Sequence, residues 1–133
     1  MTQGQVVDAA ELPVIVVGYS SKPEGRAALK RGLAEAELRS ARLVVVPTSP
    51  DVVATDLRTE LAGAGRPYEV REVADLLDPA EELLSAADSL DAAFIVIGLR
   101  RRSPVGKLLL GSNAQRVLLD ASCPVLAVKA ESA

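Results

Sequence analysis

Four short runs of apolar, mostly β-branched residues are spaced along the chain, with helix-forming segments between them. They are PVIVV at 13–17, LVVV at 43–46, AAFIVIG at 92–98 and PVLAVK at 124–129. Continuous apolar runs of this length are typical of strands that are buried on both faces. A fifth segment, 68–73, alternates polar with apolar residues, as a half-exposed edge strand does. The pattern therefore predicts five strands.

Helices are predicted between these strands, because the apolar residues there are spaced three or four apart. The second helix is expected to begin with Ser49 as its cap and Pro50 in its first position. Because strands and helices alternate throughout, we expect a three-layer α/β/α sandwich around a five-stranded parallel sheet. The predicted helices span 23–39, 49–61, 78 to the turn at 88–91, and 113–121.

The composition fits one domain with a core of aliphatic side chains. The chain has 133 residues, of which 49% are apolar and only 2% are aromatic. No part approaches the roughly 18 continuous apolar residues that a membrane span needs. Residues 1–13 lack the basic start and long apolar run of a signal peptide. We expect a flexible segment at 1–11, one domain at 12–130, a cytoplasmic location and no membrane partner.

The residue types exclude several kinds of chemistry. The chain contains no histidine, and Cys123 is its one cysteine. Ser-His-Asp, Cys-His and zinc-hydrolase sites are thereby excluded, and neither a metal site nor enzymatic activity is expected. A net charge of −3 argues against nucleic acid as a partner. Positive charge is nevertheless concentrated in one short stretch, at Arg100, Arg101 and Arg102 with Lys107.

The segment from Gly98 to Asn113 is the strongest candidate for a ligand site, together with the loop at 18–24. Both follow predicted strands, and ligands of parallel sheets bind at the carboxyl ends of strands where the winding direction reverses. Gly111 and Ser112 precede a helix, whose free N–H groups and dipole attract phosphate. Alternatively, Gly98 only permits a turn, and Gly111 or Ser112 only caps the helix. Neither the P-loop nor the GxGxxG spacing is present.

Three stretches of the sequence resemble the universal stress protein family. Residues 98–118 read GLRRRSPVGKLLLGSNAQRVL, which is similar to the family's pattern G-x2-G-x9-G-[ST]. The ending CPVLAVK resembles its last strand, and VVGYSSKPEGRAAL at 16–29 resembles its first strand and helix. The resemblance covers about 12–129. It implies a Rossmann-like, adenine nucleotide alpha hydrolase-like fold with the strand order 3-2-1-4-5.

The resemblance also implies a ligand, an adenine nucleotide with ATP as the first choice, and Mg²⁺ with its phosphates. The phosphates and ribose are expected at the two motif glycines and the residues that follow the second one: Gly98, Gly111, Ser112 and Asn113. Arg100 and Arg101 would supply counter-charge. The adenine is expected beside the ends of the first two strands, near Tyr19, Ser20 and Val46.

Two positions depart from the family pattern. Arg101 occupies the place of the middle glycine, and Ser20 stands where the family has an aspartate. An arginine can obstruct phosphate that approaches the backbone closely, or its guanidinium can hold phosphate in a bidentate pair. The arginines could equally be solvated surface residues.

The last strand is the expected site of self-association. Family members commonly dimerise there, strand against strand, and an uncovered apolar edge favours such pairing. The resemblance therefore implies a homodimer through Val125, Leu126, Ala127 and Val128. Two functions remain open at this point: a stress-response or signalling domain that binds an adenine nucleotide, and a dimeric protein-interaction module that binds none.

Overall fold

The computed structural model describes residues 11–72, 78–101 and 108–130. The segment predicted to be flexible, 1–11, lies outside the described residues except for its last one. In chain order the elements are β1 (Val14–Tyr19), α1 (Pro23–Arg39), β2 (Arg42–Pro47), α2 (Ala54–Ala62), β3 (Tyr68–Val70), α3 (Pro79–Leu90), β4 (Phe94–Arg101), β5 (Leu108–Leu109), α4 (Ser112–Asp120) and β6 (Val125–Lys129).

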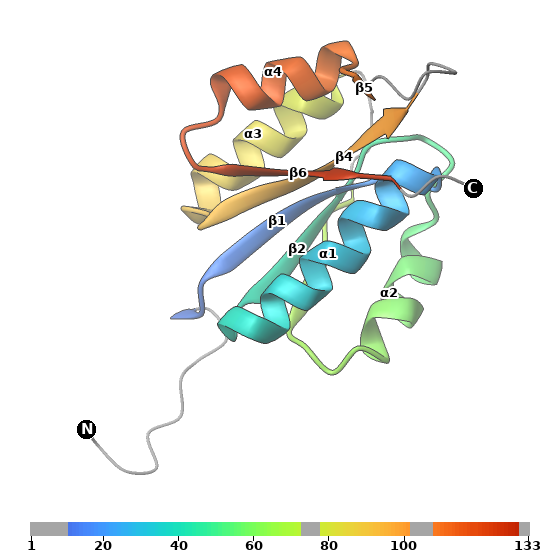
Figure 1. The fold of residues 1–133 in the computed structure, drawn as a ribbon. Helices are drawn as coiled ribbons and strands as arrows, with labels where there is room; N and C mark the ends of the chain where they lie inside the picture. The colour runs from blue at the N-terminus through green and yellow to red at the C-terminus, as the bar shows by residue number, and fades with distance from the viewer. Residues whose placement is uncertain (1–10, 73–77, 102–107, 131–133) are drawn as a thin grey trace.

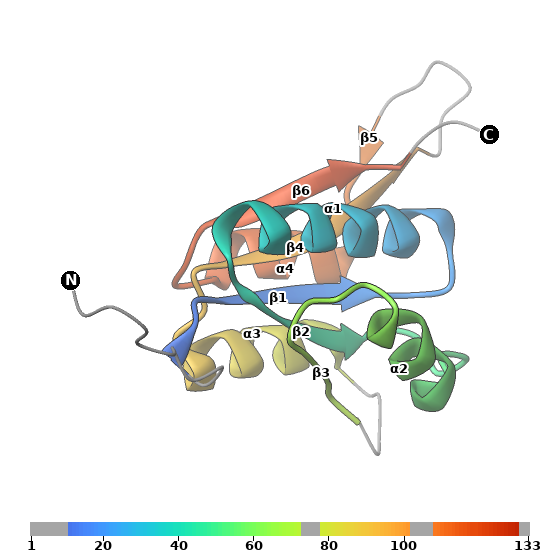
Figure 2. The same ribbon diagram turned by 90° about the horizontal axis from the view of Figure 1, so that it is seen from below.

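Five of the strands form one parallel sheet in the order β3-β2-β1-β4-β6 (Figure 2). This confirms the predicted order 3-2-1-4-5, with β6 as the fifth parallel strand. The remaining strand, β5, pairs antiparallel with the end of β4, where Arg100 faces Leu109. The direction of winding therefore reverses between the neighbouring strands β1 and β4.

The sheet is covered on both faces, as the apolar runs predict. Helices α1 and α2 lie on one face, and α3 and α4 lie on the other (Figures 1 and 2). Alternate residues of one strand belong to the two cores: Val17 packs under α1, whereas Val16 packs under α3. Because side chains alternate between faces along a strand, neighbouring residues at a strand end also point into different layers.

Three boundaries differ from the prediction. Helix α2 begins at Ala54 rather than at Pro50 after a Ser49 cap. Residues 50–51 form a turn instead, because the Asp51 carboxylate accepts a hydrogen bond from the Ser21 hydroxyl. Strand β4 continues past Gly98 to Arg101, because β6 and then β5 pair with it there. Strand β3 is an edge strand as expected but ends at Val70, and residue 73 lies outside the described residues.

Candidate functional site

Two adjoining cavities open at the carboxyl ends of β1 and β4, where the winding of the sheet reverses. Their volumes are about 140 Å³ and about 310 Å³. Such a reversal point is where parallel α/β sheets bind their ligands. We call the two cavities together the cleft. Both are lined by Ser20, Glu24, Thr48, Gly98, Asn113 and Ala114.

The two parts of the cleft differ in chemistry. The smaller cavity reaches down to the interface of α3 and α4, and its inner wall is apolar, with Pro79, Leu83 and Val117. The larger cavity opens toward the start of α4 and is lined by more polar groups, among them Ser49 and Ser112. An apolar pocket with a few polar groups at its mouth is the usual form of a small-molecule site.

Gly98 lies at the floor of the cleft, in β4. A Cβ atom on this residue would lie 1.9 Å from the backbone carbonyl oxygen of Glu24, in the first turn of α1. No side chain can be accommodated at that distance without displacing backbone. The glycine is therefore required for the packing of α1 on the sheet, whatever its part in binding a ligand.

Gly111 is the opposite case. It is the N-cap of α4, with φ −67° and no side-chain cap, and a Cβ atom there would meet nothing within 4 Å. Neither strain nor packing requires a glycine. The next residues, Ser112 and Asn113, line the cleft at the positive end of the helix dipole. This end of α4 is open to an anion.

The loops after β1 and β2 form the opposite wall. Ser20 is buried, and its hydroxyl oxygen accepts a hydrogen bond from the Lys22 N–H at 3.4 Å. Thr48 follows β2, and its hydroxyl donates to the Tyr19 carbonyl oxygen at 3.1 Å. Both residues line the two cavities, so that the wall away from α4 carries two hydroxyl-bearing side chains.

Three charged residues line the larger cavity among the described part of the chain: Lys22, Glu24 and Arg100. The Glu24 carboxylate lies 3.8 Å from Arg100 Nε, and its side chain is 18% exposed. The backbone of Arg101 pairs with Leu108. Residues 102–107 lie outside the described residues, so the expected roles of Arg102 and Lys107 stay predictions.

Two residues expected near the adenine do not line the cleft. Tyr19 is buried in the core under α1, and its hydroxyl oxygen accepts a hydrogen bond from Arg26 Nη1 at 2.9 Å. Val46 is buried in the core under α3. The sequence locates both at strand ends but does not show toward which layer each side chain points. Thr48, which follows β2, lines the cleft.

Sequence reasoning also missed lining residues. Lys22 and Glu24 lie in the loop and first helical turn at 18–24, which the parallel-sheet rule marked without assigning side chains. Thr48 directly follows the second strand, so the same rule could have identified it. No sequence pattern indicates that Pro79 and Leu83 line the cleft, because their place there depends on how α3 packs against α4.

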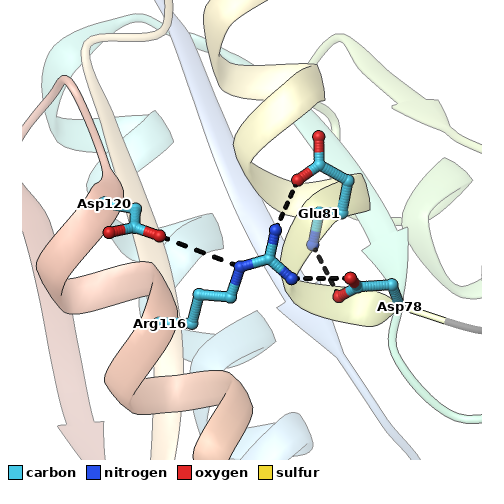
Figure 3. A network of polar contacts seen from close by, with 4 residues as sticks. All are labelled: Asp78, Glu81, Arg116 and Asp120. Atoms are coloured by element: carbon cyan, nitrogen blue, oxygen red, sulfur yellow. Dashed lines mark hydrogen bonds and ion pairs between the residues drawn. The ribbon is translucent and has the colours of Figure 1, made fainter.

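Helix α4 is attached to α3 by a network centred on Arg116 (Figure 3). The guanidinium donates to Asp78 Oδ2 and to Glu81 Oε2, each at 2.6 Å, and lies 3.8 Å from Asp120 Oδ2. Asp78 is also the N-cap of α3 and accepts a hydrogen bond from the Glu81 N–H. The Arg116 guanidinium and then this N–H lower the pKa of the Asp78 carboxyl below its ordinary value of 3.8. The network thus sets where α4 lies.

The described residues contain neither a cluster of metal-ligating side chains nor a membrane-spanning helix. No group of three or more His, Cys, Asp or Glu side chains there is placed to hold a metal ion. None of the helices in the same part of the chain combines the length and apolar character needed to cross a membrane.

The sheet order and the cleft at its reversal point define a Rossmann-like α/β domain. Residues 51–129 match the sequence profile of the universal stress protein family. A universal stress protein of Mycolicibacterium smegmatis is 47% identical over 127 residues, which cover 87% of this chain and 97% of that protein. The chain therefore belongs to the universal stress protein family.

Solved structures of similar proteins share the fold. A universal stress protein from Archaeoglobus fulgidus is 31% identical, with a TM-score of 0.65 over 89% of this chain and 98% of its own. One from the same organism in complex with dAMP is 24% identical, with a TM-score of 0.60 over 90% and 99%. A universal stress protein in complex with cAMP is 23% identical, with a TM-score of 0.66 over 90% and 98%.

Proposed function

We propose that this chain is a stress-response or signalling domain that binds an adenine nucleotide in the cleft between β1 and β4. The observation that carries the proposal is the start of α4, where Gly111, Ser112 and Asn113 present an uncapped helix terminus to the larger cavity. Two similar proteins are described as complexes with dAMP and cAMP, which supports the same class of ligand.

In this proposal the phosphates lie over the start of α4, and the base lies toward Ser20 and Thr48. Gly98 forms the floor and lets α1 approach, while Arg100 and Arg101 supply counter-charge from the end of β4. ATP is the nucleotide that the family resemblance favours. Mg²⁺ would be held chiefly by the phosphate oxygens of ATP, as is usual for this ion in nucleotide sites.

The experiment is titration calorimetry of the purified chain with ATP·Mg²⁺, AMP and cyclic AMP, repeated on Arg101→Ala. Binding of at least one nucleotide is expected, and Arg101→Ala should weaken it because a charge-assisted contact to phosphate is lost. Absence of heat with all three nucleotides at millimolar concentration would refute the proposal. Unchanged affinity in Arg101→Ala would show only that this arginine does not contact the nucleotide.

The edge strand supports a second role, which is compatible with the first. β6 pairs with β4 on one side, and Val125, Leu126, Ala127 and Val128 are all partly exposed. An open apolar edge of this kind favours strand pairing with a second copy. We propose a homodimer through β6; if the chain binds no nucleotide, this surface would make it an interaction module of the same family.

A further inference from the structure

A carboxylate lies in the part of the cleft where the phosphates are proposed to bind. Glu24 lines both cavities, and its side chain is largely covered, with 18% exposed. Its backbone is held against the sheet, because its carbonyl oxygen packs directly against Gly98, and this keeps the residue at the cleft. A negative group held at an anion site opposes binding, and its effect grows with the charge of the ligand.

Glu24 also engages one of the cations that the site offers. Its Oε2 atom lies 3.8 Å from Arg100 Nε, so part of the arginine's field is already neutralised before any ligand arrives. Of the three charged residues described around the larger cavity, Lys22 is the cation that Glu24 does not pair with. Glu24 therefore lowers the positive charge that Lys22, Arg100 and the dipole of α4 offer to a phosphate in this cavity.

We infer that Glu24 is a specificity-determining residue that limits the phosphate charge the cleft accepts, so that nucleotides with one phosphate bind more tightly than ATP in the absence of metal. The inference rests on the proposed function and refines it. Each added phosphate brings roughly one more negative charge near the carboxylate. Bound Mg²⁺ neutralises part of that charge, and so the discrimination should be weaker for ATP·Mg²⁺.

The test compares the wild-type chain with Glu24→Gln, which keeps the shape of the side chain and removes its charge. AMP, ADP and ATP are titrated in EDTA by calorimetry, and ATP is titrated again with Mg²⁺. A matched control is Glu60→Gln, because Glu60 is also ion-paired to an arginine, Arg26, but does not line the cleft.

In the wild-type chain, affinity in EDTA should fall from AMP to ATP. Glu24→Gln should raise affinity by about threefold for AMP and by about tenfold or more for ATP, as screened Coulomb repulsion predicts. Glu60→Gln should leave every affinity within about twofold of wild type, since exposed charges outside the site contribute little. An increase in affinity cannot come from a variant that folds poorly.

Two outcomes would overturn the inference while leaving the proposed function intact. In one, nucleotides bind but Glu24→Gln changes AMP and ATP affinity by the same factor or not at all. In the other, Glu24→Gln weakens ATP·Mg²⁺ binding, which would make the carboxylate a ligand of the metal. If neither protein binds any nucleotide, the proposed function itself fails, and the inference fails with it.

Discussion

Substitution by alanine should lower the stability of the fold strongly at Gly98, the first glycine of the family motif, and only slightly at Gly111, the last one. In Gly98→Ala, the new Cβ atom would lie 1.9 Å from the Glu24 carbonyl oxygen, where real contacts are longer than 3.0 Å. The two backbones must therefore separate by about 1 Å, and neither can rotate away, because one is a paired strand and the other a helix. In Gly111→Ala, the added methyl group meets nothing within 4 Å.

The overlap at Gly98 sets how much free energy of unfolding Gly98→Ala should lose. Forcing extra atoms into a packed core costs about 1–3 kcal/mol and more when backbone must move, so we expect about 3 kcal/mol for Gly98→Ala. The unfolding entropy of 133 residues is about 0.28 kcal/mol/K. The Tm of Gly98→Ala should therefore fall by about 10 °C. Gly111→Ala should cost less than about 1 kcal/mol, the difference between glycine and alanine as an N-cap.

The assay combines thermal unfolding, followed by circular dichroism, with nucleotide titration of each folded variant. Gly111→Ala should keep a Tm within about 4 °C of wild type but bind nucleotide more weakly, because its methyl group narrows the approach to the start of α4. Gly98→Ala should show the large loss of Tm even without ligand. A Gly98→Ala protein that melts within 3 °C of wild type would refute the packing explanation.

Two other predictions concern the α3–α4 network and the edge strand. Because Arg116 lowers the pKa of Asp78, the stability this pair contributes should be complete above pH 4 and disappear as the pH falls through the lowered pKa. The difference in urea stability between wild type and Arg116→Met should therefore be largest at pH 6 and shrink as the pH falls below 3.8. A difference that stays constant would contradict this. Leu126→Lys should convert the proposed dimer to monomer in sedimentation experiments, and circular dichroism would detect misfolding. A variant that stays folded and dimeric would place the interface elsewhere.

The sequence predicted the fold well because the relevant signals are local. Apolar runs and helical spacing located every strand of the parallel sheet, and the Asp78–Pro79 start of α3 is confirmed by its capping hydrogen bond. The predicted start of α2 was wrong, because Ser49 and Pro50 can also begin a turn. A turn is what forms when Asp51 binds Ser21, a contact between two loops that are distant in the sequence.

The cleft was predicted less completely, because its walls come from different layers. The strand-end rule indicated the edge of the sheet at which the cleft lies, and Gly98, Ser20 and the start of α4 line it together. The rule does not say which face a side chain takes, so Tyr19 was assigned to the ligand although it packs under α1. Glu24 was missed because its place in the cleft depends on how closely α1 approaches β4.

The close contact between Gly98 and Glu24 affects how sequences of this family are interpreted. A glycine that the fold requires persists in a descendant that no longer binds anything, since a substitution there lowers the stability of the fold and is selected against. Gly111 has no such protection, and in a lineage without a ligand it is free to drift. The first glycine of the motif is therefore a marker of common ancestry, and the last glycine is the one whose loss would report a change of function.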